Sequence, residues 1–166
     1  MPQHILITGG ASGLGAALVK HYAGLGAKIC IADLNPELAN EVIAAHSKQA
    51  DDLFFQLCDI TKQTDIEDLY KAIVSRWGKL DVLVNNAGVA TGGALEYEDI
   101  EQWQWVININ LLGLVRMTKA FVPLLSAQTH SQIINIASQA GITPIPYMAS
   151  YNASKAAVVS FSETMY

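Results

Sequence analysis

The chain has 166 residues, 51% of them hydrophobic and 15% charged, which is the balance of a compact globular domain and excludes a disordered segment. Its formal net charge of −5, with no run of Lys or Arg, argues against a nucleic-acid partner. Cys30 and Cys58 lie in apolar runs without metal-ligand spacing, so we expect reduced core cysteines and no metal site. The chain begins without a basic region followed by a long apolar stretch, and no run reaches about 18 apolar residues. These features predict a cytoplasmic protein that does not enter a membrane.

The first part of the chain alternates apolar runs with helical stripes. Residues 4–8 form an apolar run that predicts a buried strand, and an apolar stripe over 14–25 predicts a helix that Gly26 would end. A second strand is predicted at 28–33. Asn35 and the proline after it would then cap and start the next helix.

The middle of the chain continues this alternation. A third strand is predicted at 53–58, and a fourth at 80–84. Between them, Thr64 and Glu67 match a capping box at the start of an amphipathic helix that Gly78 would end.

A long helix is predicted at 99–126, followed by a fifth strand at 132–137 and a helix from Ser150. The long helix is apolar on more than one face, so we expect the sheet on one side and a partner subunit on the other, in a homo-dimer or homo-tetramer that also uses the helix from Ser150. That last helix has no Gly, Asn or Pro to end it before Tyr166, so the chain is expected to stop inside an element.

Strands that alternate with helices predict right-handed crossovers and a doubly wound parallel α/β sheet with helices on both faces. We therefore expect one Rossmann-like domain over residues 1–166, with strand order 3-2-1-4-5.

A glycine-rich turn joins the first predicted strand to the first helix. Gly9, Gly13 and Gly15 would let a dinucleotide pyrophosphate approach the backbone N–H groups at the helix start, where Ser12 and Leu14 complete the turn. A merely tight turn is the alternative. Alanines after Gly15, in place of Lys and Ser or Thr, exclude the phosphate loop of ATPases and GTPases.

Asp33 stands at the end of the second predicted strand, where a carboxylate accepts hydrogen bonds from the adenosine ribose hydroxyls. It would repel a 2′-phosphate, and neither Ser12 nor Leu34 is basic, so NAD(H) is favoured over NADP(H). A turn or capping role for Asp33 is the alternative.

Tyr151 and Lys155 are four residues apart on the last predicted helix, so their side chains share a face. An isolated tyrosine has a pKa near 10, and a neighbouring ammonium would lower it toward neutral pH. Ser138 follows the fifth strand at the carboxyl end of the sheet, where its hydroxyl could hold a substrate carbonyl while Tyr151 gives or takes the proton.

Together these residues are similar to the short-chain dehydrogenase/reductase family of the single-domain type. The matching motifs are Thr8-Gly9-x-x-x-Gly13-x-Gly15, Asp59-Ile60, Asn85-Asn86-Ala87-Gly88, Asn110 in Asn-Leu-Leu-Gly, Ser138, and Tyr151-x-x-x-Lys155.

The resemblance implies an NAD-dependent enzyme that moves a hydride between nicotinamide and an alcohol or ketone carbon. Its catalytic residues would be Asn110, Ser138, Tyr151 and Lys155, with Lys155 also gripping the nicotinamide ribose and Asn110 holding a water for proton relay. The cofactor would contact Gly9, Ser12, Gly13, Leu14, Gly15, Asp33, Leu34, Asp59, Ile60, Asn86, Ala87, Gly88, Tyr151 and Lys155. Alternatively, Asn86 satisfies backbone groups and the helix of Asn110 is plain core.

Family members usually continue past this helix into further strands and a substrate lid, which these residues do not include. The substrate is therefore open, although Ile142, Pro144 and Tyr147 hint at a hydrophobic one. The predicted fifth strand would have an exposed edge, so we expect a piece of a longer protein or a chain stabilised by association. Two other functions remain: a nucleotide-binding or scaffold protein without turnover, and an extended-type epimerase or dehydratase, for which a further domain would be needed.

Overall fold

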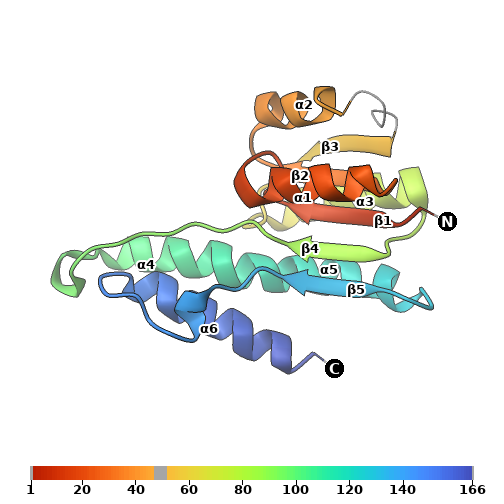
Figure 1. Ribbon diagram of the computed structural model, residues 1–166. Helices are drawn as coiled ribbons and strands as arrows, with labels where there is room; N and C mark the ends of the chain where they lie inside the picture. The colour runs from red at the N-terminus through yellow and green to blue at the C-terminus, as the bar shows by residue number, and fades with distance from the viewer. Residues whose placement is uncertain (1, 47–51, 166) are drawn as a thin grey trace.

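A five-stranded parallel sheet forms the centre of the computed structural model, which describes residues 2–46 and 52–165 (Figure 1). Its strands lie in the order β3-β2-β1-β4-β5. They are β1 (His4–Thr8), β2 (Lys28–Asp33), β3 (Leu53–Leu57), β4 (Val82–Asn85) and β5 (Gln132–Asn135). The parallel sheet and its strand order are confirmed.

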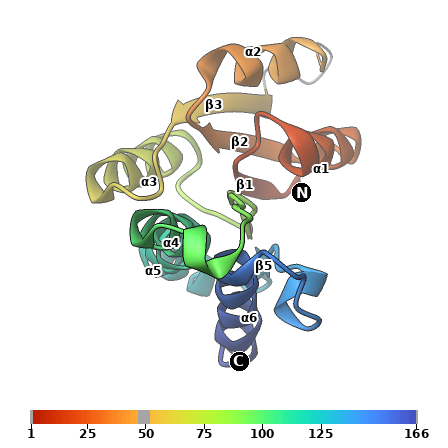
Figure 2. The same cartoon turned by 90° about the vertical axis from the view of Figure 1, so that its left-hand side faces the viewer.

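Helices join the strands and cover the sheet on both faces (Figure 2). They are α1 (Gly13–Gly24), α2 (Pro36–Ala44), α3 (Gln63–Trp77), α4 (Ile100–Ile107), α5 (Leu114–Ser126) and α6 (Ala149–Glu163), with a π-helical segment η3 (Asn108–Gly113) and short 3-10 turns η2 (Leu95–Tyr97) and η4 (Gln139–Gly141).

Two hydrophobic cores lie on the two faces of the sheet. Side chains alternate along each strand, so Ile5 and Ile7 of β1 face the helices α1 and α2, whereas Leu6 between them faces α3 and α5. The three side chains are 0% exposed. The two cysteines are free and buried, as predicted, with Cys30 within β2 and Cys58 directly after β3.

Several predicted helix ends are confirmed, and one is wrong. Asn35 caps α2, with its side chain accepting a hydrogen bond from the Leu38 N–H, and Gly78 ends α3 in the left-handed conformation. The capping box at Thr64 is wrong, because α3 begins earlier, at Gln63, without a side-chain cap. The carboxylate of Asp65 instead accepts a hydrogen bond from the Asp59 N–H at 3.0 Å, across the preceding turn.

Some strand and helix limits also differ from prediction. β4 begins at Val82 rather than at residue 80, because the side chain of Asp81 turns back to the backbone of His4. β5 ends at Asn135, two residues early, where the Ala137 N–H folds back onto the Asn135 carbonyl. β3 likewise ends one residue early.

The last helix was expected to run on to Tyr166, which lies outside the described residues, but α6 ends at Glu163. There the N–H and the hydroxyl of Thr164 both donate to the Phe161 carbonyl.

The long helix is present, but its middle turn is π-helical rather than α-helical. In the part of the chain that the structure describes, residues 100–126 are the one helix long and apolar enough to cross a membrane by length and composition. This is weak evidence, since a core helix passes the same test. Met117 and Phe121, both 0% exposed, pack this helix against the sheet and α3.

Candidate active site

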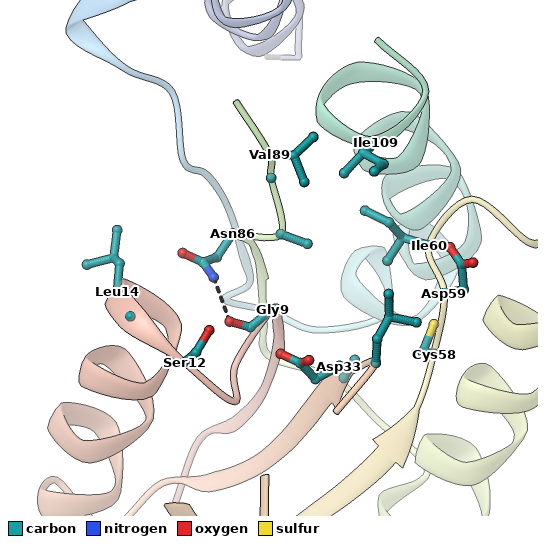
Figure 3. A pocket seen from close by; sticks show the side chains of 15 residues that line it. Gly9, Ser12, Leu14, Asp33, Cys58, Asp59, Ile60, Asn86, Val89 and Ile109 are labelled. Carbon is teal, nitrogen blue, oxygen red and sulfur yellow. Dashed lines mark hydrogen bonds between the residues drawn. The ribbon is translucent and has the colours of Figure 1, made fainter. Parts of the chain in front are cut away.

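A cavity of about 390 Å³ opens at the carboxyl ends of β1, β2, β3 and β4 (Figure 3). Its volume is in the range of small-molecule sites. It is lined by the predicted cofactor residues Gly9, Ser12, Gly13, Leu14, Asp33, Leu34, Asp59, Ile60, Asn86, Ala87 and Gly88. Four further residues that the sequence analysis missed also line it, namely Ala32, Cys58, Val89 and Ile109. They are small or apolar and carry no polar signal of their own.

The glycine turn brings the start of α1 close to β1. A Cβ on Gly15 would clash with the carbonyl oxygen of Gly9, and Gly9 itself has a φ of +62°. Gly15 therefore lies behind the cavity wall and allows helix and strand to meet. Ser12 precedes α1 without capping it by its side chain, and the first turn of the helix contains no acidic residue. The N–H groups of that turn are thus suited to an anion such as pyrophosphate.

Asp33 has the turn-holding role that the sequence analysis gave as its alternative, and its side chain also lies at the cavity where the ribose role would place it. One carboxylate oxygen accepts a hydrogen bond from the Ala11 N–H at 2.9 Å and the other from the Asn35 N–H at 3.1 Å, which holds the turn. The side chain also lines the cavity. Since each carboxylate oxygen accepts more than one hydrogen bond, ribose hydroxyls could still be bound there.

Two neighbouring residues of the cavity lining, Cys58 and Asp59, have pKa values that are shifted in opposite directions. Burial would raise the pKa of Asp59, but hydrogen bonds from Thr61 and the Lys62 ammonium outweigh it and lower that pKa. Burial, reinforced by the carboxylates of Asp65 and Asp59, raises the pKa of Cys58 to about 12. The carboxylate is thus charged at neutral pH, whereas the thiol is protonated.

The side chain of Asn86 forms hydrogen bonds with backbone groups, which is the alternative that the sequence analysis gave for this residue. Its amide donates to the carbonyls of Thr8 and Gly9 at 2.9 and 3.0 Å, and the second of these bonds is drawn in Figure 3. The Thr8 hydroxyl in turn accepts hydrogen bonds from the N–H groups of Asn86 and Ala87. These contacts fix the chain that leaves β4 against the glycine turn.

Lys155 and Tyr151 lie outside the cavity lining, on the first turns of α6. The Lys155 ammonium is 5.8 Å from the centroid of the Tyr151 ring and donates to the Ile136 carbonyl at 2.7 Å. Burial lowers the pKa of Lys155, whose residue is 6% exposed. A Cβ on Gly88 would lie only 3.6 Å from that ammonium, so the cavity wall and the lysine adjoin.

Asn110 belongs to the π-helical segment, and its side chain grips the backbone of Val89. Its Oδ1 accepts from the Val89 N–H and its Nδ2 donates to the Val89 carbonyl, both at 2.8 Å. Ser138 precedes η4, where its Oγ accepts a hydrogen bond from the Ala140 N–H. The turn η4 packs on α6, since a Cβ on Gly141 would lie 2.7 Å from the Lys155 carbonyl.

No group of three or more His, Cys, Asp or Glu side chains that could hold a metal occurs among the described residues. Ile142 and Tyr147, which hinted at a hydrophobic substrate, are 77% and 73% exposed.

The chain matches the model of the family described as short chain dehydrogenase over residues 3–166. It is 41% identical over 153 residues to a 2,5-dichloro-2,5-cyclohexadiene-1,4-diol dehydrogenase of Sphingobium indicum, covering 92% of this chain and 61% of that protein. To a 3-ketodihydrosphingosine reductase of Bacteroides thetaiotaomicron it is 34% identical, covering 99% of this chain and 57% of the relative.

Solved structures give the same result. A short chain dehydrogenase/reductase from Burkholderia phymatum in complex with NAD superposes with a TM-score of 0.94 at 33% identity, covering 99% of this chain and 59% of that one. An NAD⁺-bound xylitol dehydrogenase superposes with a TM-score of 0.93 at 28% identity, covering 98% and 63%. The chain therefore spans about three-fifths of the length of these relatives.

Proposed function

We propose, since this chain belongs to the short chain dehydrogenase family, that it forms the cofactor-binding and proton-transfer part of an NAD(H)-dependent alcohol dehydrogenase or ketone reductase. One observation carries the proposal. Gly88, which lines the cavity, lies close to the Lys155 ammonium, and that ammonium lies over the Tyr151 ring. A bound dinucleotide and a proton-transfer pair would thus meet at one point of the molecule.

The lining of the cavity fits NAD(H). The first turn of α1 would hold the pyrophosphate, Asp33 the adenosine ribose hydroxyls, and Asp59 and Ile60 the adenine side. Leu34, which is 63% exposed beside Asp33, offers no positive charge to a 2′-phosphate, so NADP(H) should bind more weakly.

When bound, the nicotinamide would accept the hydride in one direction of the reaction and donate it in the other. In the direction of alcohol oxidation, Tyr151 would accept the hydroxyl proton of the substrate as the carbinol carbon, which becomes a carbonyl, passes its hydride to the oxidised nicotinamide. The Lys155 ammonium, which lies over the Tyr151 ring, would hold the nicotinamide ribose. Ser138 would orient the substrate oxygen, and Asn110 would support a water on the path of the proton from Lys155 to solvent.

The substitution Tyr151→Phe tests this mechanism. We expect kcat to fall by about 10²–10⁴-fold, because the general acid/base is lost, while the affinity for NADH, measured by its fluorescence, is unchanged. Turnover is followed by NADH absorbance over a panel of secondary alcohols and ketones, and Tyr22→Phe on α1 serves as the control with normal activity.

Two outcomes would contradict the proposal. Normal turnover by the Tyr151→Phe variant would exclude the tyrosine mechanism. Binding of NADH without turnover of any panel compound by the unmodified protein would favour the nucleotide-binding protein without catalysis.

A further inference from the structure

Two serines on α6 each stand one residue before a proposed catalytic side chain. Ser150 precedes Tyr151, and Ser154 precedes Lys155. Like the tyrosine and lysine, the serines are four residues apart and so lie one turn apart on a single face, rotated by about 100° from the catalytic face. Both serines are 0% exposed.

The hydroxyls of both serines connect to the segment 89–91 that follows β4, that of Ser150 directly and that of Ser154 through Asn110. The Ser150 Oγ lies 3.0 Å from the hydroxyl of Thr91. The Ser154 Oγ accepts from the Asn110 Nδ2 at 3.0 Å, and Asn110 holds Val89 by its two backbone groups. Ser154 also donates to the Tyr151 carbonyl at 2.7 Å.

These contacts connect the orientation of α6 to the wall of the cofactor cavity. Val89 lines the cavity, and it is fixed through Asn110 to Ser154. A rotation of α6 about its axis would break the hydrogen bonds that the two serines make to Thr91 and Asn110, and buried polar groups would lose partners, which is unfavourable. The same rotation would carry Tyr151 and Lys155 away from Gly88.

We propose that Ser150 and Ser154 are positioning residues, which fix the rotation of α6 and thereby aim Tyr151 and Lys155 at the nicotinamide end of the cavity. This inference rests on the proposed function, since it concerns the geometry of the same proton transfer. Small buried serines also occur simply because a helix packs closely there, and in that case their hydroxyls would have no influence on turnover.

Pairs of variants with equal volume separate the two explanations. Ser154→Thr keeps the hydroxyl and Ser154→Val removes it, with the same added bulk, and Ser150→Thr and Ser150→Val form a second pair. We expect kcat to be at least about tenfold lower in each Val variant than in its Thr partner, because misplaced reacting groups slow the chemical step. The affinity for NADH, measured by fluorescence, should be equal within each pair.

The control is Ser160→Ala, an exposed serine on the same helix, which should keep normal kcat and KM. Ser150→Ala and Ser154→Ala remove the hydroxyls without adding volume and carry the same expectation as the Val variants if the larger side chains prevent folding. Substrate and conditions are those that give the highest turnover in the alcohol and ketone panel.

Equal kcat within the Thr and Val pairs, together with a lower melting temperature for the Val variants, would overturn the inference and leave the serines a packing role alone. That result leaves the proposed function intact, because the unmodified protein is active in it. An unmodified protein that turns over no panel compound would overturn both.

Discussion

Gly15 is a position where the volume of one methyl group decides whether β1 and α1 can meet. A Cβ there would also lie 2.7 Å from the Asn86 amide nitrogen, which holds the chain that leaves β4. The glycine turn and the segment that follows β4 therefore both require a residue without a side chain at position 15.

Gly15→Ala should destabilise the protein by about 1–3 kcal/mol, because overpacking against backbone forces the turn to move, and should weaken NADH binding. Gly24→Ala is the control on the same helix, since a Cβ there would meet no atom within 4 Å. The measurements are denaturant unfolding and NADH fluorescence. If the two variants unfold alike and bind NADH alike, the contact between Gly9 and α1 does not require glycine.

Asp81 connects the starts of β1 and β4. Burial would raise its pKa, but hydrogen bonds from the His4 N–H and ring and from the Lys79 ammonium outweigh it and lower that pKa. A carboxyl group whose pKa is lower in the folded state stabilises the protein above its unfolded pKa of about 3.9 and loses that contribution as pH falls through the folded value.

Asp81→Asn should therefore cost about 2 kcal/mol of unfolding free energy near pH 7, and this difference from the unmodified protein should shrink in acid below about pH 4. Urea unfolding across pH measures it. Asp68→Asn, at a carboxyl that is 65% exposed in a surface pair with Lys71, should change stability little at any pH. A difference for Asp81→Asn that stays constant into acid would contradict this account.

At the scale of elements, the π-helical segment η3 is the feature that shapes the site. Its last residue, Gly113, lies against Ile60, so that a Cβ there would be 2.7 Å from the Ile60 Cδ1. Ile60 lines the proposed adenine side of the cavity, together with Ile109 of the same segment. The long helix thus supports the cavity wall from behind.

Gly113→Ala should push Ile60 toward the cavity and weaken NADH binding several-fold, measured by fluorescence titration. Ile60→Val removes the Cδ1 methyl, so the double variant should recover most of the lost affinity. The cycle of single and double variants measures this coupling directly. An affinity equally low in the double variant would show that the strain lies elsewhere in η3.

The predictions from sequence succeeded where the cause is local. The alternation of strands and helices, the cap at Asn35 and the stop at Gly78 follow from residues within a few positions of each other. The structure also gathers most of the predicted cofactor residues around one cavity, since the ends of parallel strands meet at one edge of the sheet.

Features that depend on distant partners could not be predicted. The π-helical turn accompanies contacts of Asn110 with Val89, 21 residues away, and no local pattern marks it. Ser150 and Ser154 were missed for the same reason, because their partners lie on other segments.

At the scale of the whole molecule, exposed apolar side chains remain on the long helix. Trp105 is 48% and Leu112 is 44% exposed. Along the described chain, β3 pairs with β2 alone and β5 with β4 alone, so both edges of the sheet are open. We propose that the long helix and α6 meet a second copy of the protein, as the sequence suggested.

Trp105→Glu should shift a homo-oligomer toward monomer, because a charge would be buried in the interface. Sedimentation velocity at several protein concentrations measures this. Leu25→Glu, at an exposed leucine after α1, is the control and should keep the oligomeric state. An assembly unchanged by Trp105→Glu would exclude this face as the interface.

The cavity is lined from four strand ends, with Gly9, Asp33, Asp59 and Asn86 among the residues that they contribute. Those segments are far apart in the chain, and the folded sheet together with hydrogen bonds such as that from Asn86 to Gly9 holds them side by side. A dinucleotide bound there would contact all four segments, and because it binds only the folded protein, it would raise the free energy of unfolding. The lifetime of such a protein against proteases would then follow the supply of its cofactor, falling when the nucleotide pool is depleted.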